Sequence, residues 1–312
     1  MSRDGPRIGV VGATGAVGRV TVALLHERGY TNVRAFASSR SAGSRIGTLE
    51  VELASTETLG AGDLDVCFFS VGTSASRELV PVAADAGAVC VDKSAAYRLD
   101  DGVPLVVPEV NGGRALEHRG IVANPNCCSI PLTMALAPLR DAAGLRGVRV
   151  ATYQSASGAG AQAIERLRGE TPDEHDLRMD WSFDGAEFDE ESKIRDETRK
   201  ILELPELPVS ATCVRVPVLV GHAEAVWVET EEPLGTAAAE RILSSAAGLS
   251  YETFPTPGKA MGTDEVLVGR VRTDAAGENG LAFFLACDNL RKGAALNAIQ
   301  IAELVLPIRA TA

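Results

Sequence analysis

A glycine-rich turn between a short apolar segment and an amphipathic one constrains the fold of this chain more than any other feature. The turn Gly12-Ala-Thr-Gly15-Ala-Val-Gly18 follows an apolar run at residues 8–11, and residues 16–28 repeat apolar side chains at helical spacing. Glycines in such a turn let the backbone approach a pyrophosphate, and the following helix offers free N–H groups and the positive end of its dipole. The same glycines could form an ordinary tight turn, but their position between a strand and a helix favours dinucleotide binding.

The segments after this turn continue the alternation of strands and helices. A helix is predicted at residues 74–86 and ends at Gly87. The predicted strands occupy residues 8–11, 33–37, 64–71, 89–92 and 121–124. This βαβ rhythm predicts a Rossmann-like, doubly wound parallel sheet.

The second half of the chain has longer β-like runs, which predict a mostly antiparallel sheet in an α+β domain. The runs occupy residues 148–155, 213–220, 224–230, 266–273 and 281–288. Helices are predicted at residues 161–168 and 190–202, and the acidic stretch 169–191 is predicted to be a solvated connection.

We therefore expect an α/β protein of two domains. Residues 1–126 form a dinucleotide-binding domain, to which a C-terminal helix within residues 290–312 returns. Residues 127–289 form the second domain.

The acidic composition limits the partners of the chain. Its 312 residues carry a net charge of −12, whereas binding to a phosphate backbone needs a basic face, so we expect no nucleic-acid partner. No apolar stretch approaches the roughly 20 residues of a membrane span, so we expect no membrane association. The six cysteines form no CxxC pair, which favours free thiols in a reducing cytoplasm. We predict no metal site.

The end of the second predicted strand indicates which dinucleotide binds. An NAD site usually places an acidic residue there for the ribose 2′-OH. Between Tyr30 and Leu49 the chain has no Asp or Glu, but it has Arg40 followed by Ser41, and Arg45 further on. A guanidinium beside hydroxyl groups suits a 2′-phosphate, so NADP is favoured, although Arg45 could equally be a solvated surface residue.

The segment Asn124-Pro-Asn-Cys127-Cys-Ser contains a candidate nucleophile. An apolar, helix-like run follows it, so Cys127 is expected at a helix N-terminus, where the dipole stabilises a thiolate. The alternative is an ordinary buried cysteine, and Cys128 is the better candidate for that role.

A base and an anion-binding residue are predicted further along the chain. His222 follows a hydrophobic strand and a glycine, with Glu224 close behind, which is a suitable place for proton transfer. Arg215 lies within the same apolar strand, where an arginine normally needs an anionic ligand or an acidic partner. A purely structural ion pair is the alternative for Arg215.

These motifs, in this order, resemble those of bacterial aspartate-semialdehyde dehydrogenases from about Ile8 to Glu303. The segments that carry the resemblance are Gly12–Gly18, Ser39–Gly43, Asn124–Cys127, Tyr153–Gly160, Arg215–Val218 with Gly221-His222, and Asp288–Gly293. The resemblance implies a cytoplasmic homodimer whose second domain is catalytic and forms the dimer. It also implies NADP-dependent interconversion of aspartyl 4-phosphate with aspartate 4-semialdehyde and phosphate, a step in lysine, threonine and methionine biosynthesis.

The resemblance also assigns roles to individual residues. Cys127 would form a thioester, His222 would be the acid/base and Gln154 would orient the acyl group. The residues implied in substrate and phosphate binding are Arg98, Asn126, Glu190, Lys193 and Arg215. The residues implied in cofactor binding are Gly12, Thr14, Gly15, Ala16, Val17, Arg40, Ser41, Ser157, Gly158 and Asn289. For Glu190 and Lys193 an exposed i,i+3 ion pair is the alternative.

Three features depart from the family pattern and leave alternatives open. The stretch from Gln162 to Glu190 is short and acidic, Cys128 replaces the usual Ser after the nucleophile, and Lys93 stands where Asn is common. The alternatives are the same mechanism on another acyl phosphate or aldehyde, and an NADP-binding scaffold without activity. A scaffold would be expected to lack the nucleophile or the base, and this chain has both.

Overall fold

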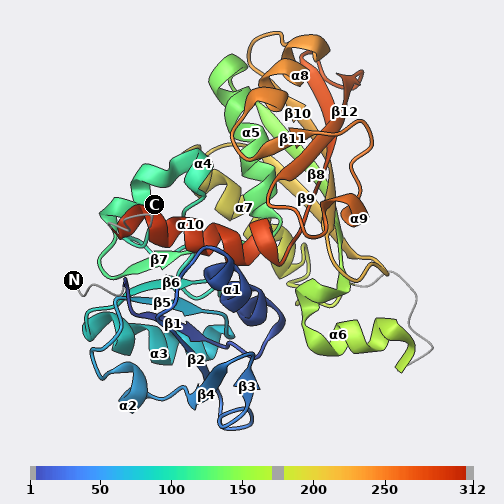
Figure 1. Cartoon of the computed structure of the whole chain (residues 1–312). Helices are drawn as coiled ribbons and strands as arrows, with labels where there is room; N and C mark the ends of the chain where they lie inside the picture. Colours follow the sequence, from blue (N-terminus) through green and yellow to red (C-terminus); the bar gives the residue numbers. More distant parts are fainter. Residues whose placement is uncertain (1–4, 171–178, 307–312) are drawn as a thin grey trace. The chain divides into compact units, whose positions relative to one another are not determined.

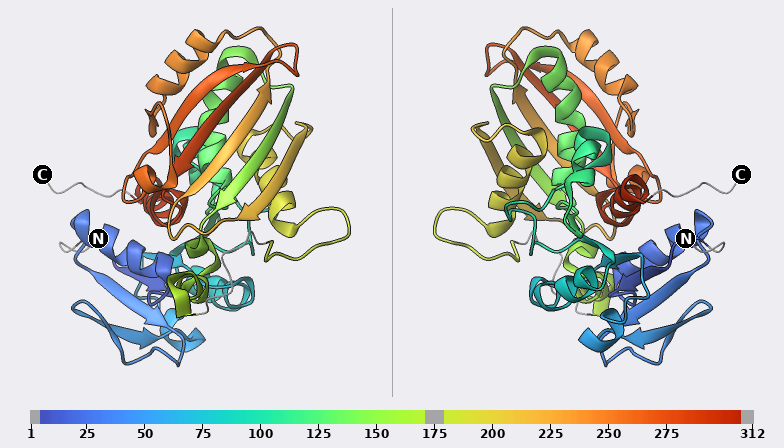
Figure 2. Two further views of the ribbon diagram at one scale, coloured as in Figure 1. Left: turned by 90° about the vertical axis from the view of Figure 1, so that its right-hand side faces the viewer. Right: turned by 90° about the vertical axis from the view of Figure 1, so that its left-hand side faces the viewer.

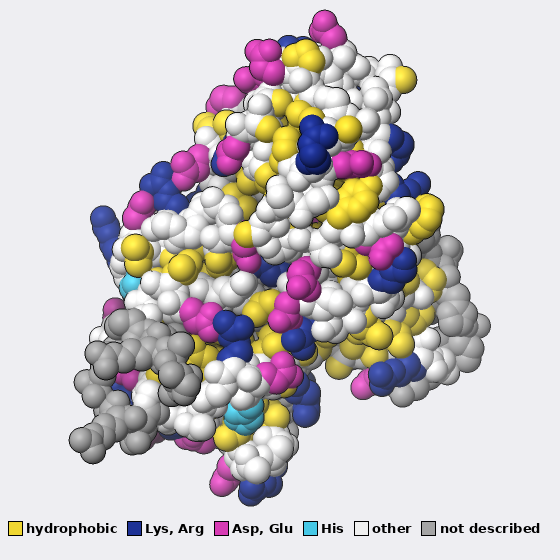
Figure 3. Space-filling model, turned by 45° about the horizontal axis from the view of Figure 1, so that its top comes forward, with side chains coloured by type: hydrophobic (Ala, Val, Ile, Leu, Met, Phe, Trp, Pro, Cys, Tyr) yellow, Lys and Arg dark blue, Asp and Glu magenta, His cyan; other side chains and the backbone are white. Residues whose placement is uncertain are grey.

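The computed structural model describes residues 5–170 and 179–306, and the chain divides into two compact units (Figure 1). The first unit combines Met1–Pro125 with Ala294–Ala312, and the second is Asn126–Gly293. Among the described residues, none of the helices has the length and apolar character needed to cross a bilayer. On the face shown in Figure 3, Lys and Arg side chains are interspersed with Asp and Glu side chains.

The first unit contains the predicted parallel sheet, in the order β3-β4-β2-β1-β5-β6-β7. Every neighbouring pair is parallel except the edge pair β3–β4. The strands are β1 (Ile8–Val11), β2 (Val33–Ala37), β3 (Arg45–Ile46), β4 (Leu49–Leu53), β5 (Val66–Phe69), β6 (Val89–Asp92) and β7 (Ile121–Ala123). All four residues of β1 and of β5 are buried, as expected of strands that helices cover on both faces.

Helices lie on both sides of this sheet. Figure 1 shows α1 and α10 on one side and α3 on the other. The helices of the unit are α1 (Ala16–Glu27), α2 (Thr56–Leu59), α3 (Thr73–Asp85), α4 (Pro108–Asn111) and α10 (Leu296–Val305). One core cluster joins α10 to β1 and α1 through Ile299, Ile8 and Leu25, so the C-terminal helix completes the core of this unit.

The second unit contains a six-stranded sheet in the order β11-β12-β13-β10-β8-β9. Its strands are β8 (Gly147–Gln154), β9 (Val209–Arg215), β10 (His222–Glu229), β11 (Leu249–Tyr251), β12 (Val266–Asp274) and β13 (Gly280–Cys287). The pairs β12–β13, β13–β10 and β10–β8 are antiparallel, whereas β8–β9 and β11–β12 are parallel. The predicted α+β domain with a mostly antiparallel sheet is confirmed.

Most helices of the second unit pack on one face of its sheet, whereas the short helix Pro257–Ala260 packs on the other face through Ala260. The helices are α5 (Ser129–Ala143), α6 (Ala161–Glu165), α7 (Asp189–Leu202), α8 (Thr236–Ser245) and α9 (Pro257–Ala260). Of these, α7 packs on β9, α8 on β11 and β12, and α5 on β13. The left view in Figure 2 shows the opposite face of the sheet toward the viewer, with α5 behind the strands. Burial alternates along β8 from Val148 to Gln154, so the sheet has one buried and one more exposed face.

Two of the predicted segments differ from the structure. The bounds of the strand predicted at residues 213–220 are wrong, because β9 begins at Val209 and ends at Arg215, and the next strand begins at His222. Pro217 has no N–H to donate to a sheet, so the apolar run that follows Arg215 cannot continue the pairing with β8. The acidic connection predicted at residues 169–191 falls partly outside the described residues. Its last two residues, Glu190 and Glu191, are buried rather than solvated.

Candidate active site

Cys127 lies at the start of α5, as the sequence predicts. The helix begins at Ser129, and the carbonyl groups of Asn126 and Cys128 accept its first backbone hydrogen bonds. The side-chain oxygen of Asn126 accepts a 2.8 Å hydrogen bond from the backbone N–H of Cys128. The Cys127 side chain is partly exposed, whereas Cys128 is 0% exposed, so only the first of the two adjacent thiols is accessible.

His222 is the first residue of β10 and lies near both thiols. The Sγ atoms of Cys127 and Cys128 and a ring nitrogen of His222 lie within 4.8 Å of one another. The backbone N–H of Ser155 donates a 2.9 Å hydrogen bond to Nδ1 of His222. Because Nδ1 is an acceptor there, the neutral imidazole carries its proton on Nε2. Nε2 is buried and has no hydrogen-bond partner among the described residues.

Two thiols and an imidazole are also the side chains that bind thiophilic metal ions. A metal ion on Nε2 of His222 would require the ring proton to be on Nδ1, where it would face the backbone N–H of Ser155. This hydrogen bond therefore disfavours the imidazole as a metal ligand.

Glu190 links the predicted substrate-binding residues Asn126 and Gln154. Its Oε1 accepts hydrogen bonds from Nδ2 of Asn126 at 2.9 Å and from Nε2 of Gln154 at 3.1 Å. Burial raises the pKa of Glu190 and the negative charge of Cys127 raises it further, while the hydrogen bond from Asn126, the charge of Lys193 and the hydrogen bond from Gln154 oppose the rise. The exposed ion pair that was the alternative for Glu190 is therefore wrong, because the Glu190 side chain is buried. Lys193 lies 3.8 Å from Glu190 and makes its closer contact, 2.7 Å, with Asp189.

Glu197 is a buried residue of this site that the sequence analysis did not identify. It is 1% exposed on α7, and its Oε2 accepts a 2.6 Å hydrogen bond from the backbone N–H of Asn126. Glu190 and Glu197 are two helical turns apart and so lie on one face of α7. The helical spacing of these two acids was the only signal in the sequence that could have identified Glu197.

Arg215, at the end of β9, is 7% exposed and lies near His222. Its Nη1 donates a 2.9 Å hydrogen bond to the carbonyl of Ser155, and its Nε lies 3.0 Å from a carboxylate oxygen of Asp180. The guanidinium also lies over the ring of Trp181, 4.8 Å from its centroid. Arg215 thus has an acidic partner, Asp180, which agrees with a structural ion pair. It also lies beside Ser155 and His222, which agrees with a role in substrate binding.

The segment predicted to contact the cofactor in this unit packs against His222 and Arg215. A Cβ atom on Gly158 would lie 3.1 Å from Nε2 of His222 and 3.2 Å from Nη1 of Arg215, so only glycine fits there without a shift. Asn289 connects this segment to the turn before His222. Its Oδ1 accepts hydrogen bonds from the backbone N–H of Gly221 at 2.8 Å and from Oγ of Ser157 at 3.1 Å.

In the first unit, the glycine-rich turn forms a cradle that larger residues could not form. A Cβ atom on Gly12, whose φ is +80°, would lie 2.3 Å from the carbonyl oxygen of Ser70, and one on Gly18 would lie 2.1 Å from that of Gly12. Gly15 precedes the first turn of α1, whose N–H groups are available to a phosphate. These features fit a dinucleotide pyrophosphate. The other predicted cofactor-binding residues of this unit are Thr14, Ala16 and Val17 around the turn, and Arg40 and Ser41 directly after β2, where the Arg40 side chain is exposed.

Arg98 and Lys93 are also in the first unit. Arg98 is buried, and it donates hydrogen bonds to the carbonyl groups of Asn124 at 3.1 Å and Lys93 at 2.7 Å. The predicted role of Arg98 in phosphate binding stays a prediction. Nζ of Lys93 bonds to the hydroxyl groups of Thr21 and Ser70, each at 2.8 Å. Burial lowers the pKa of Lys93 to about 7, partly offset by the charge of Asp92.

Comparison with known proteins gives a consistent family match in both units. The model of the semialdehyde dehydrogenase NAD-binding domain matches residues 7–118, and that of the semialdehyde dehydrogenase dimerisation domain matches residues 136–292. Aspartate-semialdehyde dehydrogenase of Streptomyces akiyoshiensis is 43% identical over 96% of this chain and 98% of its own length. That of Aquifex aeolicus is 40% identical over 97% and 98%.

A solved structure agrees with this match. Aspartate semialdehyde dehydrogenase II of Vibrio cholerae superimposes with a TM-score of 0.91 and 39% identity, over 96% of this chain and 98% of that one. The fold, the two domain matches and the identities over nearly the full length lead to one conclusion. This chain belongs to the aspartate-semialdehyde dehydrogenase family.

Proposed function

We propose that this chain catalyses the NADP-dependent interconversion of aspartyl 4-phosphate with aspartate 4-semialdehyde and phosphate, a step in the synthesis of lysine, threonine and methionine. The observation that carries the proposal is the grouping of an accessible thiol, an imidazole and a buried arginine in the second unit. The structure of the Vibrio cholerae relative is a complex with ASA, and this chain is 39% identical to it.

Cys127 is the nucleophile in this proposal. Its sulfur attacks the acyl carbon of the acyl phosphate, so a carbon–sulfur bond forms, the carbon–oxygen bond to phosphate breaks, and phosphate leaves with the bonding electrons. Arg215 binds the α-carboxylate of the substrate, and Gln154 orients the acyl group. The hydrogen bond from Gln154 to Glu190 fixes the amide for this purpose.

His222 acts as the acid toward the substrate oxygen. Because its Nδ1 accepts the N–H of Ser155, its Nε2–H points away from that contact and has no partner in the described structure. A buried N–H without an acceptor costs free energy, and the carbonyl oxygen of the substrate would supply the acceptor as it becomes an oxyanion. The backbone of Ser155 thereby sets the tautomer of the neutral ring before substrate binds.

The glycine cradle of the first unit would hold the pyrophosphate of NADP, and Arg40 with Ser41 its 2′-phosphate. When bound, the nicotinamide supplies hydride transfer to and from the acyl carbon. Ser157, Gly158 and Asn289 are also proposed as cofactor-binding residues.

A direct assay tests the proposed activity. Purified protein is mixed with NADP, phosphate and aspartate 4-semialdehyde, and NADPH formation is followed beside parallel reactions with other small aldehydes. We expect reduction that depends on phosphate and is fastest with aspartate 4-semialdehyde. Faster reduction with another aldehyde would favour a different acyl substrate, and no reduction with any aldehyde would contradict the enzymatic function.

Arg40→Ala should reduce the preference for NADP over NAD. The guanidinium of Arg40 is exposed at the end of β2 and is proposed to make a charge-assisted contact with the 2′-phosphate. Its loss should weaken NADP binding by about 1–3 kcal/mol and leave NAD binding unchanged. Calorimetric titration of both cofactors measures the difference, with Arg45→Ala as the matched control. Equal losses for the two cofactors would contradict the assignment.

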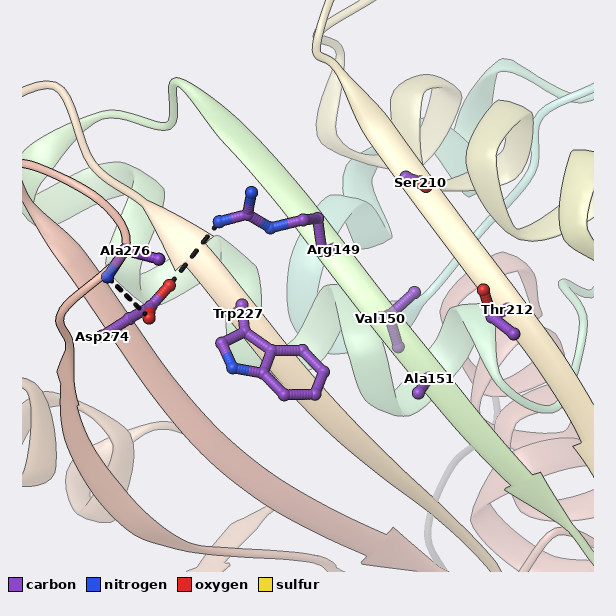
Figure 4. A pocket seen from close by; sticks show the side chains of 8 residues that line it. All are labelled: Arg149, Val150, Ala151, Ser210, Thr212, Trp227, Asp274 and Ala276. Carbon is purple, nitrogen blue, oxygen red and sulfur yellow. Dashed lines mark hydrogen bonds and ion pairs between the residues drawn. The ribbon is translucent and has the colours of Figure 1, made fainter.

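We also propose that the second unit forms a homodimer through the open face of its sheet. A shallow hollow of about 400 Å³ on this face is lined by residues of β8, β9 and β10 and by Asp274 and Ala276 (Figure 4). Figure 4 shows the ring of Trp227 beside the ion pair of Arg149 and Asp274, whose charged atoms are 3.5 Å apart. Tyr153 of β8 and Phe284 of β13, which lie on either side of β10, form a ring contact at a centroid distance of 6.2 Å. Aromatic and arginine side chains of this kind are enriched in subunit interfaces.

Trp227→Glu should dissociate this dimer. A carboxylate in place of the indole would bring a charge into the interface, and Arg149, which lies opposite it in the sheet, is already paired with Asp274; the dissociation constant should rise at least about tenfold. Light scattering at micromolar concentration measures the mass of the wild type and the variant. Leu116→Glu, at an apolar residue of the first unit that is 69% exposed, is the control and should stay dimeric. A monomeric wild type, or a Trp227→Glu variant that remains dimeric, would contradict the proposed interface.

A further inference from the structure

Lys93 connects the two flanks of the glycine-rich turn in the first unit, and the mechanism above gives it no role. The residue directly follows β6 and is partly buried. Its Nζ donates hydrogen bonds of 2.8 Å to the hydroxyl groups of Thr21 on α1 and of Ser70 directly after β5. Nζ also lies 5.7 Å from the centroid of the Phe68 ring, and Phe68 is 1% exposed. The amino group therefore joins the end of β6 to α1 and to the end of β5.

Both hydrogen-bond partners of Lys93 belong to the walls of the glycine cradle. The carbonyl oxygen of Ser70 is the atom that a Cβ on Gly12 would approach to 2.3 Å, so Ser70 packs directly against the turn. The hydroxyl group of Thr21, which is 0% exposed, donates a 2.8 Å hydrogen bond to the carbonyl of Val17 in the first turn of α1. Each flank of the cradle is thus separated from Nζ of Lys93 by a single hydrogen-bonded residue.

These contacts suit a neutral amine in the free protein. A neutral amine has two N–H groups, which the two hydroxyl groups accept, whereas the third N–H of an ammonium has no partner in the described part of the chain. Burial lowers the pKa of Lys93 to about 7, and the charge of Asp92 partly offsets this. The carboxylate of Asp92 accepts hydrogen bonds from the hydroxyl groups of Ser76 and Ser94. An anion in the cradle would favour the ammonium form of Lys93.

The other ionisable groups around β5 and β6 are exposed, paired or neutral. The exposed groups on the helices here are Arg19, His26 and Glu27 of α1 and Arg77, Glu78 and Asp85 of α3. On α10, which packs on β6, Glu303 is paired with Arg28. Burial raises the pKa of Cys67 on β5 and of Cys90 on β6, so both remain thiols. The guanidinium of Arg98 donates to the carbonyl of Lys93. Asp92 is the one charged group in the described structure that acts on the pKa of Lys93.

We propose that Lys93 is a positioning residue of the cofactor cradle and takes up a proton when the pyrophosphate of a dinucleotide binds there. In the free protein at pH 8, the neutral amine holds Thr21 and Ser70 in place. The negative charge of the bound dinucleotide then stabilises the ammonium form, and the proton comes from the solvent. This proton is not transferred to the substrate. The proposal rests on the proposed binding of NADP to the glycine cradle.

The affinity for NADP should therefore decrease as the pH rises above about 7. Below this pH, Lys93 of the free protein already carries the proton, so its charge attracts the cofactor without proton uptake. Above it, the free protein must bind a proton to form the same complex, and the affinity falls. We expect a fall of at least about fivefold between pH 7 and pH 9, with uptake of about half a proton at pH 8.

Calorimetric titration of the full chain with NADP at pH 8, in two buffers with different ionisation enthalpies, measures the proton uptake. Lys93→Met removes the amine, so uptake should be smaller than in the wild type by about half a proton. Lys93→Arg keeps a cation that does not titrate here, so its affinity should be constant from pH 7 to pH 9. Lys259→Met, at an exposed lysine of the second unit, is the control and should match the wild type. Other groups that titrate on binding, such as Cys127, contribute equally to all four proteins.

Two results would overturn the role of Lys93. One is equal proton uptake in the wild type and in Lys93→Met, which would leave Lys93 as a purely structural tie between α1 and β5. The other is an affinity of Lys93→Arg that falls with pH as steeply as that of the wild type. If Lys93→Met fails to fold, as a melting curve would show, Lys93→Arg and the smaller Lys93→Asn still decide the question. Failure of the proposed cofactor site would look different, since the wild type would then bind no NADP at any pH.

Discussion

The Cys127→Ser variant should lose turnover by about 10⁴-fold or more and still bind NADP with wild-type affinity. A serine hydroxyl at this position has no base that could activate it, because Nδ1 of His222 accepts the N–H of Ser155 and its Nε2 already carries the proton. The glycine cradle, at Gly12 to Gly18, is remote in sequence and is unchanged by the substitution. Steady-state rates and a cofactor titration measure the two properties separately.

The adjacent thiol provides the control for this substitution. Cys128→Ser should retain most of the turnover, because the hydroxyl group keeps a donor in the same buried position. Mass spectrometry of the wild type mixed with substrate and NADP should find a trapped acyl group on Cys127. An acyl group on Cys128 would shift the nucleophile by one residue, and full turnover in both variants would exclude a thioester mechanism.

Arg215→Leu should lower kcat/KM by more than about a hundredfold, chiefly through KM. The guanidinium is 7% exposed, and a substrate carboxylate that lost such a partner would lose about 3 kcal/mol or more of binding. Alkylation of Cys127 by iodoacetamide should stay normal in this variant, because a neutral reagent makes no use of the arginine. Initial rates over a range of substrate concentrations measure the effect.

The Asp180→Asn variant distinguishes binding of the substrate carboxylate by Arg215 from a purely structural ion pair. Asp180 accepts from Nε of Arg215 and has a side chain that is 32% exposed, so its loss should change the melting temperature little. If Arg215 served only to pair with Asp180, the two variants would share a small loss of stability and keep a normal KM. A normal KM in Arg215→Leu would therefore contradict its assignment to the substrate carboxylate.

The elements that the sequence predicts best are those whose signal is local. The strands at Ile8–Val11, Val33–Ala37 and Val89–Asp92 have the predicted bounds, because apolar runs between turn residues define buried parallel strands. The helix start near Cys127 follows from the Asn-Pro-Asn segment in the same way.

The features that the sequence analysis did not predict depend on contacts between distant residues. Residues 216–220 are apolar, but the pairing of β9 ends at Arg215 opposite Gln154, which only the partner strand reveals. Glu224 and Glu197 look like surface acids in the sequence, and their burial comes from α5, α7 and the sheet closing over them. The hydrogen bond from Ser155 to His222, which sets the tautomer, joins residues 67 positions apart.

The first unit is built from two segments that are far apart in the sequence, and this determines the order in which the two units can fold during synthesis. Residues 126–293 are contiguous, so the second unit can complete its core as soon as it leaves the ribosome. The first unit emerges earlier but lacks α10, whose Ile299 and Ile301 belong to the same core as β1 and α1. Asn297 of α10 also holds the side chain of Asn124, through a 2.9 Å hydrogen bond to its Oδ1. The nucleotide-binding unit, although synthesised first, is therefore the last to be completed, when α10 has left the ribosome and can join its core.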